Sequence, residues 1–184
     1  SDGHVYDPNG LSLKTVKQIK LSEHGRIREY VERHPEAEYY EKCSDIWTVP
    51  CDIALPCATQ NELDEQAARS LVENGVTVVA EGANMPCTSE AIDVFLENGV
   101  LFGPAQAVNA GGVAVSALEM AQNSSRMVWT FEQVDQQLHN IMKNIYKNCL
   151  QASEEYGHPG NLVIGANIYG FKRVADTMIA QGVI

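Results

Sequence analysis

Three segments rich in small and amide-bearing residues are candidates for ligand binding. They are LPCATQN at 55–61, EGANMP at 81–86 and GPAQAVNAGG at 103–112. Small residues allow a ligand to approach the backbone closely, while amide and hydroxyl side chains supply neutral donors and acceptors. These groups suit a carboxamide or a ribose hydroxyl better than a metal ion or a phosphate. Asn and Gly also build ordinary tight turns, which is the alternative interpretation of each segment taken alone.

The third segment leads directly into a predicted helix that contains Val113, Ser116 and Met120. Free backbone N–H groups at the start of that helix would favour an anionic or polar ligand group. Ser116 lies one turn into the helix and could present its hydroxyl to a carboxylate. A helical serine of this kind is also commonly packed or solvated, so both interpretations stay open.

Other groups that a complete enzyme site would need are missing from the sequence. There is no GxGxxG motif, so the pyrophosphate of a dinucleotide would lack its usual binding loop. The histidines and lysines fall in polar helical or terminal segments, and we predict no catalytic residue in this chain. The cysteines contain no CxxC pair, which argues against a metal site and favours reduced thiols in a cytoplasm. They are Cys43, Cys51, Cys57, Cys87 and Cys149.

Strand-like and helix-like segments alternate between about residues 45 and 128, which predicts a parallel sheet. The apolar runs predicted as strands are 46–49 continuing to 52–55, then 76–80, then 100–102. Such nearly unbroken apolar runs suit strands that are covered on both faces. The three candidate segments follow these strands. In an open parallel sheet the loops at the carboxyl ends of the strands line the ligand crevice.

Capping patterns place the helices between the strands. Thr59 and Glu62 have the spacing of a capping box and predict a helix start, and a second helix is predicted over 89–97. Both helices run into the sequence ENGV, whose glycines, Gly75 and Gly99, predict left-handed C-caps.

Beyond residue 128 the pattern becomes helical, and Thr130 with Gln133 predicts the cap of a long helix. A helical stretch interrupted near 22–25 is also predicted over about 11–34. The apolar positions that define the long helix are Val134, Leu138, Ile141, Met142, Ile145 and Cys149, and those of a last helix are Phe171, Val174, Met178 and Ile179.

Composition limits the size and the partners of the protein. A chain of 184 residues that is 45% hydrophobic is enough for one α/β domain and too short for two full-sized ones. A net charge of -11 repels nucleic acid and anionic lipid. No apolar run approaches the roughly 20 residues that a membrane span needs, and the first residues do not resemble a signal peptide. We expect a soluble, cytoplasmic protein that binds neither nucleic acid nor membrane.

The runs CATQNELD at 57–64, VAEGANMP at 79–86 and NAGGVAVSALEMAQN at 109–123 resemble the hexameric, NADP-type glutamate dehydrogenases. The resemblance extends from SDGHVYD at 1–7 to GANIYGF at 165–171 and the final AQGVI, so it covers essentially the whole chain.

The resemblance implies an α/β fold with a Rossmann-like, mainly parallel sheet, flanking helices and long carboxy-terminal helices. The sheet would be truncated at its amino-terminal βα unit, and residues 1–184 would form a single partial dinucleotide-binding domain whose last helices return toward a missing substrate domain. Family members oxidise L-glutamate through 2-iminoglutarate to 2-oxoglutarate and ammonia, moving the Cα hydride to nicotinamide.

By resemblance, Asn84 and Asn109 contact the nicotinamide end of the coenzyme, while Ala58 and Thr59 pass near its adenosine half. Val113 and Ser116 meet the substrate side chain, and the Ser116 hydroxyl bonds the γ-carboxylate.

The family's catalytic Lys and Asp, its ligands for the substrate α-carboxylate and its glycine-rich loop would all lie upstream of this sequence. Residues on one side of an active-site cleft cannot by themselves position the reactants and stabilise the transition state for hydride transfer. We therefore expect the isolated chain to be inactive. NADP is the expected coenzyme from overall similarity to bacterial biosynthetic members, with NAD as the alternative. Ser1 and Asp2 are expected near the adenosine ribose.

Two other functions remain open from the sequence. A leucine- or phenylalanine-type amino acid dehydrogenase would share the architecture but would need an apolar pocket where Ser116 offers a hydroxyl. A non-catalytic nucleotide-binding module would need no upstream partner residues at all.

Overall fold

The computed structural model describes residues 3–182, and the chain divides into two compact units. The first unit runs to Val49 and the second begins at Pro50. The expectations for Ser1 and Asp2 lie outside the described residues.

The first unit is a two-stranded antiparallel sheet with short helical segments between its strands. Strand β1 (His4–Tyr6) pairs with β2 (Glu38–Tyr40), so that His4 faces Tyr40 and Tyr6 faces Glu38. Tyr30 and Ile19 are buried at the centre of this unit. The helical segments are α1 (Leu13–Lys17), a π-helical turn (Gln18–Ser22), a 3-10 turn (Ile27–Glu29) and α2 (Tyr30–Arg33). The predicted interruption of this helical stretch is therefore confirmed.

The second unit contains a three-stranded parallel sheet in the order β3, β4, β5. The strands are β3 (Ile53–Ala54), β4 (Val78–Ala80) and β5 (Leu101–Gly103). Ile53 is aligned with Val78, and Val78 with Leu101, in a single parallel register. The predicted α/β class with a parallel sheet is confirmed, with strands shorter than the apolar runs suggested.

The predicted strand over 46–49 is wrong, because Cys43–Thr48 forms a 3-10 helix. Its polar groups bond locally: the Thr48 hydroxyl donates to the carbonyl oxygen of Asp45 at 2.8 Å, and Val49 N donates to the carbonyl oxygen of Ile46 at 3.2 Å. Pro50 follows and has no N–H group for a strand ladder. Local bonding and the proline together prevent a continuous strand up to Leu55.

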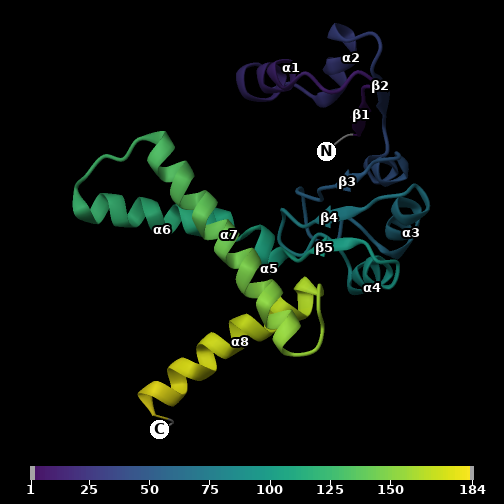
Figure 1. Cartoon of the computed structure of the whole chain (residues 1–184). Helices are drawn as coiled ribbons and strands as arrows, with labels where there is room; N and C mark the ends of the chain where they lie inside the picture. Colours follow the sequence, from purple (N-terminus) through teal and green to yellow (C-terminus); the bar gives the residue numbers. More distant parts are fainter. Residues whose placement is uncertain (1–2, 183–184) are drawn as a thin grey trace. The chain divides into compact units, whose positions relative to one another are not determined.

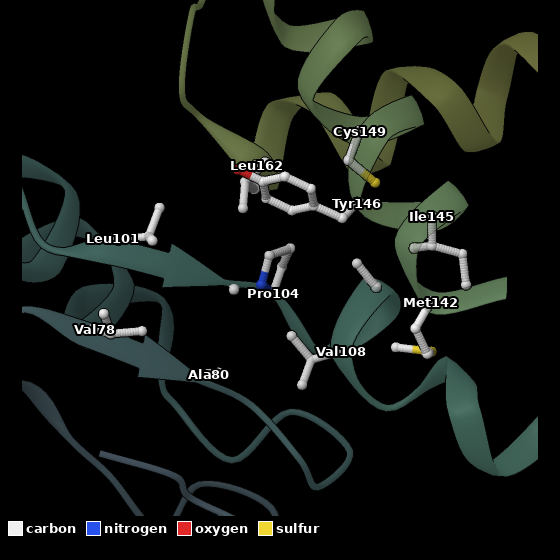
Figure 2. Close-up of a pocket in the computed structure, with 12 residues that line it drawn as sticks. Val78, Ala80, Leu101, Pro104, Val108, Met142, Ile145, Tyr146, Cys149 and Leu162 are labelled. Carbon is white, nitrogen blue, oxygen red and sulfur yellow. The ribbon is translucent and has the colours of Figure 1, made fainter. Parts of the chain in front are cut away.

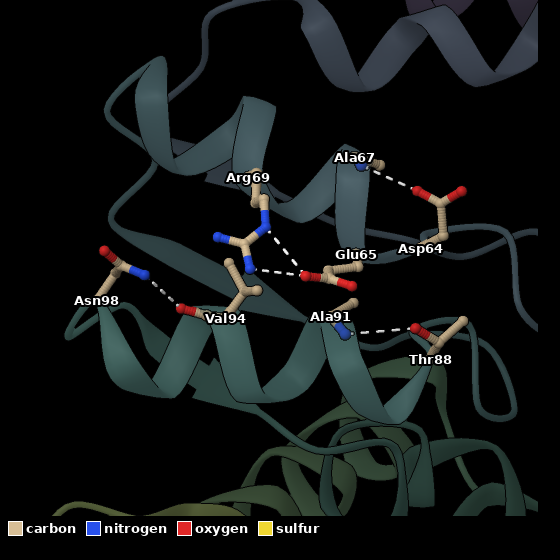
Figure 3. A network of polar contacts seen from close by, with 8 residues as sticks. All are labelled: Asp64, Glu65, Ala67, Arg69, Thr88, Ala91, Val94 and Asn98. Carbon is tan, nitrogen blue, oxygen red and sulfur yellow. Dashed lines mark hydrogen bonds and ion pairs between the residues drawn. The ribbon is translucent and has the colours of Figure 1, made fainter.

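Two nine-residue helices, α3 (Glu65–Glu73) and α4 (Ser89–Glu97), pack together on one side of this sheet (Figure 1). Figure 3 shows their amino-terminal caps. The Asp64 carboxylate accepts from Ala67 N at 2.9 Å, and the Thr88 hydroxyl accepts from Ala91 N at 3.3 Å. The bounds of α4 match the prediction.

The predicted helix start at Thr59 is wrong, because α3 begins six residues later at Glu65. Leu63 forms a parallel bridge with Cys87, and its N–H donates to the carbonyl oxygen of Pro86 at 3.0 Å. An extended Leu63 cannot be part of a helix. The Glu62 carboxylate instead accepts a hydrogen bond from Ala58 N at 2.9 Å and closes a turn.

The glycines that end these two helices have the predicted left-handed conformation. Gly75 has φ 87° and Gly99 has φ 70°. Val76 N then donates to the carbonyl oxygen of Leu71, and Val100 N to that of Phe95, each at 3.0 Å. Each C-cap thus turns the chain from its helix into the next strand.

In the described part of the chain after β5, the helices are α5 (Ala105–Val108), α6 (Ala110–Ser125), α7 (Phe131–Glu155) and α8 (Leu162–Gln181). The predicted cap of α7 is confirmed, since Thr130 and Gln133 form a reciprocal capping box. Helices α7 and α8 approach closely at Gly165, where a Cβ atom would lie 2.0 Å from the carbonyl oxygen of Cys149. Within residues 3–182 no helix combines the length and apolar character needed to cross a membrane.

Candidate functional site

The three candidate loops lie at the carboxyl edge of the sheet and are hydrogen-bonded to one another. Gly82 N donates to the carbonyl oxygen of Pro56 at 3.0 Å, which joins the second loop to the first. Asn61 N donates to the carbonyl oxygen of Met85 at 3.0 Å. The side-chain amide of Asn109 donates to the carbonyl oxygen of Ala83 at 3.0 Å, which joins the third loop to the second. The loops therefore form one connected surface.

Glu81 is a buried acidic residue at the end of β4, with only 3% of its surface exposed. Its Oε1 accepts from Cys87 N at 3.1 Å, and its Oε2 accepts from Ala105 N at 2.7 Å. Its own N–H donates to the carbonyl oxygen of Gly103 at 3.0 Å. One side chain thus holds the end of the second loop and the first residue of α5. Buried charges in proteins are normally paired or hydrogen-bonded in this way.

The Cys87 thiol lies beside this carboxylate. Burial raises the pKa of Cys87 well above its usual range, and the negative charge of Glu81 raises it further. A thiol with a raised pKa stays protonated at neutral pH and is a poor nucleophile. Cys87 is therefore a buried packing residue.

Small residues in these loops let the loops approach each other. A Cβ atom at Gly82 would lie 2.4 Å from the Sγ atom of Cys57, and a Cβ atom at Gly103 would lie 2.8 Å from a methyl group of Val108. Both distances are too short for a real side chain. These two glycines are accounted for by loop packing, whereas the sequence suggested close approach by a ligand.

Asn109, Val113 and Ser116 follow one face of a helical segment. Asn109 has helical dihedral angles (φ -84°, ψ -1°), and the spacings of four and three residues place the three side chains above one another. Val113 is 76% exposed, and Ser116 is also exposed. Gly111 faces another way, because a Cβ atom there would contact Leu138 of α7 at 3.4 Å. The structure thus brings three of the predicted site residues together.

The start of α6 differs from the free helix terminus that we expected. Helix α5 immediately precedes it, so that Asn109 N donates to the carbonyl oxygen of Ala105 at 3.0 Å and Gly112 N donates to that of Asn109 at 3.2 Å. Those two amides already have partners. The Ser116 hydroxyl donates to the carbonyl oxygen of Gly112 at 3.3 Å, a long bond that a better acceptor could replace.

The remaining predicted residues lie on the first two loops. Asn84 is exposed and precedes Met85, which has a left-handed conformation with φ 51°. Ala58 and Thr59 are exposed on the first loop. Asn84 directly follows Ala83, the acceptor for the Asn109 amide, so the two asparagines lie at adjoining positions.

An apolar pocket of about 220 Å³ lies elsewhere, between one face of the sheet and helix α7 (Figure 2). Val78 and Leu101 line it from the sheet, and Met142 and Tyr146 line it from α7. Nearly all of its lining is apolar, so it lacks the convergent polar groups that fix a coenzyme. The loop surface, and not this pocket, is the candidate binding site.

Comparison with known proteins decides the family. A model of the family described as Glutamate/Leucine/Phenylalanine/Valine dehydrogenase matches residues 1–182. The chain belongs to this family. It is 54% identical over 187 residues to an NADP-specific glutamate dehydrogenase of Salmonella typhimurium and 51% identical over 189 residues to one of Helicobacter pylori. These matches cover 100% of this chain but 41% and 42% of the relatives, so the chain spans about two-fifths of their length.

Solved structures of this dehydrogenase family agree with the fold. A Plasmodium falciparum glutamate dehydrogenase superposes with a TM-score of 0.94 at 43% identity, covering 100% of this chain and 40% of that one. A second enzyme of that organism, glutamate dehydrogenase 2, gives a TM-score of 0.93 at 42% identity, with 100% and 41% covered.

One buried residue at the candidate site was not recognised from the sequence patterns. Glu81 lies within the EGANMP segment, but no role was assigned to it. The available signal was a charged residue directly after the apolar run Val76–Ala80. A charge at the buried end of a strand needs hydrogen-bond partners, and those partners are visible only in the folded chain.

Within residues 3–182 no group of three or more His, Cys, Asp or Glu side chains could hold a metal ion. Apart from the exposed Cys57 thiol, the polar groups available at the loop surface are neutral amides, hydroxyls and backbone atoms. They can bind and orient a polar ligand, but they cannot exchange a proton easily near neutral pH.

Proposed function

We propose that this chain is the carboxy-terminal, coenzyme-binding part of an NADP-dependent glutamate dehydrogenase. The observation that carries the proposal is the connected loop surface, on which the amides of Asn84 and Asn109 lie at adjoining positions. The longer protein would interconvert L-glutamate, NADP and water with 2-oxoglutarate, ammonia and NADPH. The names of the bacterial relatives support glutamate as substrate and NADP as coenzyme.

The amide chemistry of this surface fits the nicotinamide end of such a coenzyme. The Asn109 amide nitrogen donates to Ala83, which directs one donor away and leaves the side-chain oxygen able to accept. Asn84 is exposed and offers both a donor and an acceptor. A carboxamide needs one partner of each kind. The coenzyme, when bound, supplies the hydride acceptor or donor, while these residues orient its ring.

The adenosine half of the coenzyme is assigned to the first loop. Ala58 and Thr59 are small and exposed, and they leave room for a flat ring system and a ribose. Their loop is held to the second loop through Pro56 and Gly82. The two halves of the ligand would therefore lie on parts of one connected surface.

The substrate would be recognised farther along α6. Val113 and Ser116 continue the helix face that begins at Asn109, so a ligand beside the nicotinamide would meet them next. Ser116 would donate its hydroxyl to the γ-carboxylate of glutamate in place of its 3.3 Å bond to Gly112. Val113 would pack against the methylene groups of the same side chain.

This surface provides orientation but no acid or base. We therefore propose that the catalytic Lys and Asp and the ligands for the substrate α-carboxylate are supplied by the rest of the protein, and that residues 1–184 belong to a partial dinucleotide-binding domain. We also propose a homo-hexameric, cytoplasmic enzyme, in keeping with the family to which the chain is similar.

The test is oxidation of NADPH that depends on both 2-oxoglutarate and ammonia. The product of the complete gene should show this activity, and the purified 184-residue chain should not. NADH in place of NADPH measures the coenzyme preference of the same preparation. Turnover by the isolated chain would contradict the assignment of the catalytic groups to the rest of the protein.

Substrate range separates glutamate from the other members of the family. Branched-chain and aromatic 2-oxo acids should be poor substrates, because an apolar side chain would leave the Ser116 hydroxyl without its charged partner. Preferred use of those acids would identify a leucine- or phenylalanine-type enzyme instead. Coenzyme binding without turnover of any 2-oxo acid would indicate a non-catalytic binding module.

A further inference from the structure

Glu81 closes a ring of contacts around the two asparagines of the candidate site. Its Oε2 accepts from Ala105 N at 2.7 Å, and Ala105 begins the single turn of α5. That turn ends at Asn109, whose N–H donates to the carbonyl oxygen of Ala105 at 3.0 Å. The Asn109 side chain then donates to Ala83, two residues beyond Glu81.

The other oxygen of the same carboxylate holds the far end of the second loop. Oε1 accepts from Cys87 N at 3.1 Å, so the segment with Asn84 is bounded by Glu81 at its start and by Cys87 at its end. Among the described residues, no buried side-chain polar atom lacks a hydrogen-bond partner. Both oxygens of Glu81 are therefore committed to backbone amides, one on each segment that carries an asparagine.

We infer that Glu81 is a positioning residue that fixes the coenzyme-binding asparagines relative to each other, an inference that rests on the proposed function. Glu81 lies behind the loops and is nearly inaccessible, so it does not touch the coenzyme itself. A neutral amide could not replace it, because one of its two terminal atoms would be a donor facing a backbone donor. Two acceptors at one buried position require a carboxylate.

The two halves of the coenzyme should depend on Glu81 to different degrees. The segments that Glu81 holds carry Asn84 and Asn109, which are assigned to the nicotinamide end. The first loop, with Ala58 and Thr59, is bonded to the second loop at Pro56, whereas the Glu81 carboxylate bonds Cys87 N and Ala105 N, which lie outside the first loop. Removal of the carboxylate should therefore weaken binding of the nicotinamide end more than binding of the adenosine half.

The experiment compares Glu81→Gln with the unaltered product of the complete gene. The dissociation constants of NADPH and of adenosine 2′,5′-bisphosphate are measured by titration, together with KM for coenzyme and for 2-oxoglutarate. Loss of one charged hydrogen bond predicts about tenfold weaker binding of NADPH. Binding of adenosine 2′,5′-bisphosphate and KM for 2-oxoglutarate should change less than about twofold, a difference below 0.5 kcal/mol. Glu97→Gln, on an exposed position of α4, is the matched control.

Several outcomes would overturn the inference. Unchanged NADPH binding would show that the asparagines do not depend on Glu81. Equal weakening of NADPH and adenosine 2′,5′-bisphosphate would show general loss of structure. A double-variant cycle adds a further criterion, because Glu81→Gln should have a smaller effect when Asn84 is already Ala. Additive effects of the two substitutions would also contradict positioning.

The experiment distinguishes failure of the proposed function from failure of the inference about Glu81. If the unaltered protein neither binds nor oxidises NADPH, the proposed function fails and the inference fails with it. If the unaltered protein is active and Glu81→Gln matches it, the inference alone fails. Should Glu81→Gln not fold, Glu81→Asp keeps the charge but is one methylene shorter and cannot reach both amides. Wild-type NADPH affinity in a folded Glu81→Asp protein would overturn the inference.

Discussion

The side-chain nitrogen of Asn109 donates a hydrogen bond to the carbonyl oxygen of Ala83 across 3.0 Å, and this bond joins the start of α6 to the loop after β4. The two residues are 26 positions apart in sequence. The bond fixes which end of the Asn109 amide faces the loop, and therefore which end remains for a ligand. It makes Asn109 both a structural link and a candidate ligand contact.

Replacement of Asn109 by Asp should weaken NADPH binding by the complete protein. The aspartate cannot donate to the Ala83 carbonyl, and its charge would repel that oxygen. Loss of the bond predicts about 1–3 kcal/mol of destabilisation and an NADPH dissociation constant raised about tenfold. Fluorescence titration measures the affinity. Asn144→Asp, which makes the same charge change on an exposed turn of α7, should bind NADPH normally. Equal affinities for the two variants would refute the dual role of Asn109.

Replacement of Ser116 by Ala should raise KM for 2-oxoglutarate while leaving KM for NADPH nearly unchanged. A hydrogen bond to a charged group contributes about 1.5–3 kcal/mol, which corresponds to a rise in KM of about tenfold or more. Steady-state kinetics of the complete protein measure both constants. Ser125→Ala is a matched control, because Ser125 lies at the other end of α6 and also donates to a backbone carbonyl of its helix. If the kinetics of Ser116→Ala stay at wild-type values, Ser116 does not bind the γ-carboxylate.

Two glycines of α8 should respond in opposite directions to replacement by Ala. At Gly165 the added Cβ atom would lie 2.0 Å from the Cys149 carbonyl oxygen, so α7 and α8 must move apart. Overpacking of this kind predicts a loss of about 1–3 kcal/mol in the free energy of unfolding. At Gly170 an added Cβ atom would meet nothing within 4 Å beyond its own helix backbone, and Ala should stabilise the helix by about 0.4–1 kcal/mol. Urea denaturation of the 184-residue chain, followed by circular dichroism, measures both. Stability gained at Gly165 would show that the two helices do not cross as described.

Stability should depend on pH through Glu132 at the start of α7. Its pKa lies below the usual value, because its own backbone N–H and the Thr130 hydroxyl bond the charged form. A group with a lowered folded pKa stabilises the protein above its unfolded pKa, about 4.3 for glutamate, and this stabilisation disappears as pH falls through the folded pKa. Glu132→Gln should therefore be less stable than wild type at pH 7 and equally stable at strongly acidic pH.

The measurement for Glu132 is the free energy of urea unfolding at a series of pH values. Glu119→Gln, on an exposed middle turn of α6, is the control for removing a carboxylate away from a helix start. A stability difference for Glu132→Gln that is the same at every pH would mean that its charge is not involved.

Local patterns predicted the later helices well. The Thr130 capping box, the bounds of α4 and the left-handed glycines after α3 and α4 all appear in the structure. Each depends on residues within a few positions of one another. The apolar stripe predicted for the last helix also lies on α8, but its members are exposed in this chain, with Phe171 75% exposed. The periodicity indicated that one face of this helix is apolar, but it did not show which segment packs against that face.

Two predictions from the local pattern were wrong, one because of a nonlocal pairing and the other because of local hydrogen bonds and a proline. The Thr59 capping box competes with the pairing of Leu63 to Cys87, 24 residues later, and the pairing prevails. The nearly unbroken apolar run 46–49 is typical of a strand, but its residues form part of a 3-10 helix before Pro50. Strand formation depends on a partner across the sheet, and a short apolar run does not identify one.

The sequence by itself determined the α/β class, the three polar loops after the strands and the family, because these follow from short-range patterns and from motifs spread along the chain. Only the tertiary structure decided how the loops are joined. The bond from Asn109 to Ala83, the contact that excludes a side chain at Gly82 and the two amides held by Glu81 all connect residues on different elements. Buried polar groups must find partners wherever the fold places them, and those partners are set by three-dimensional packing.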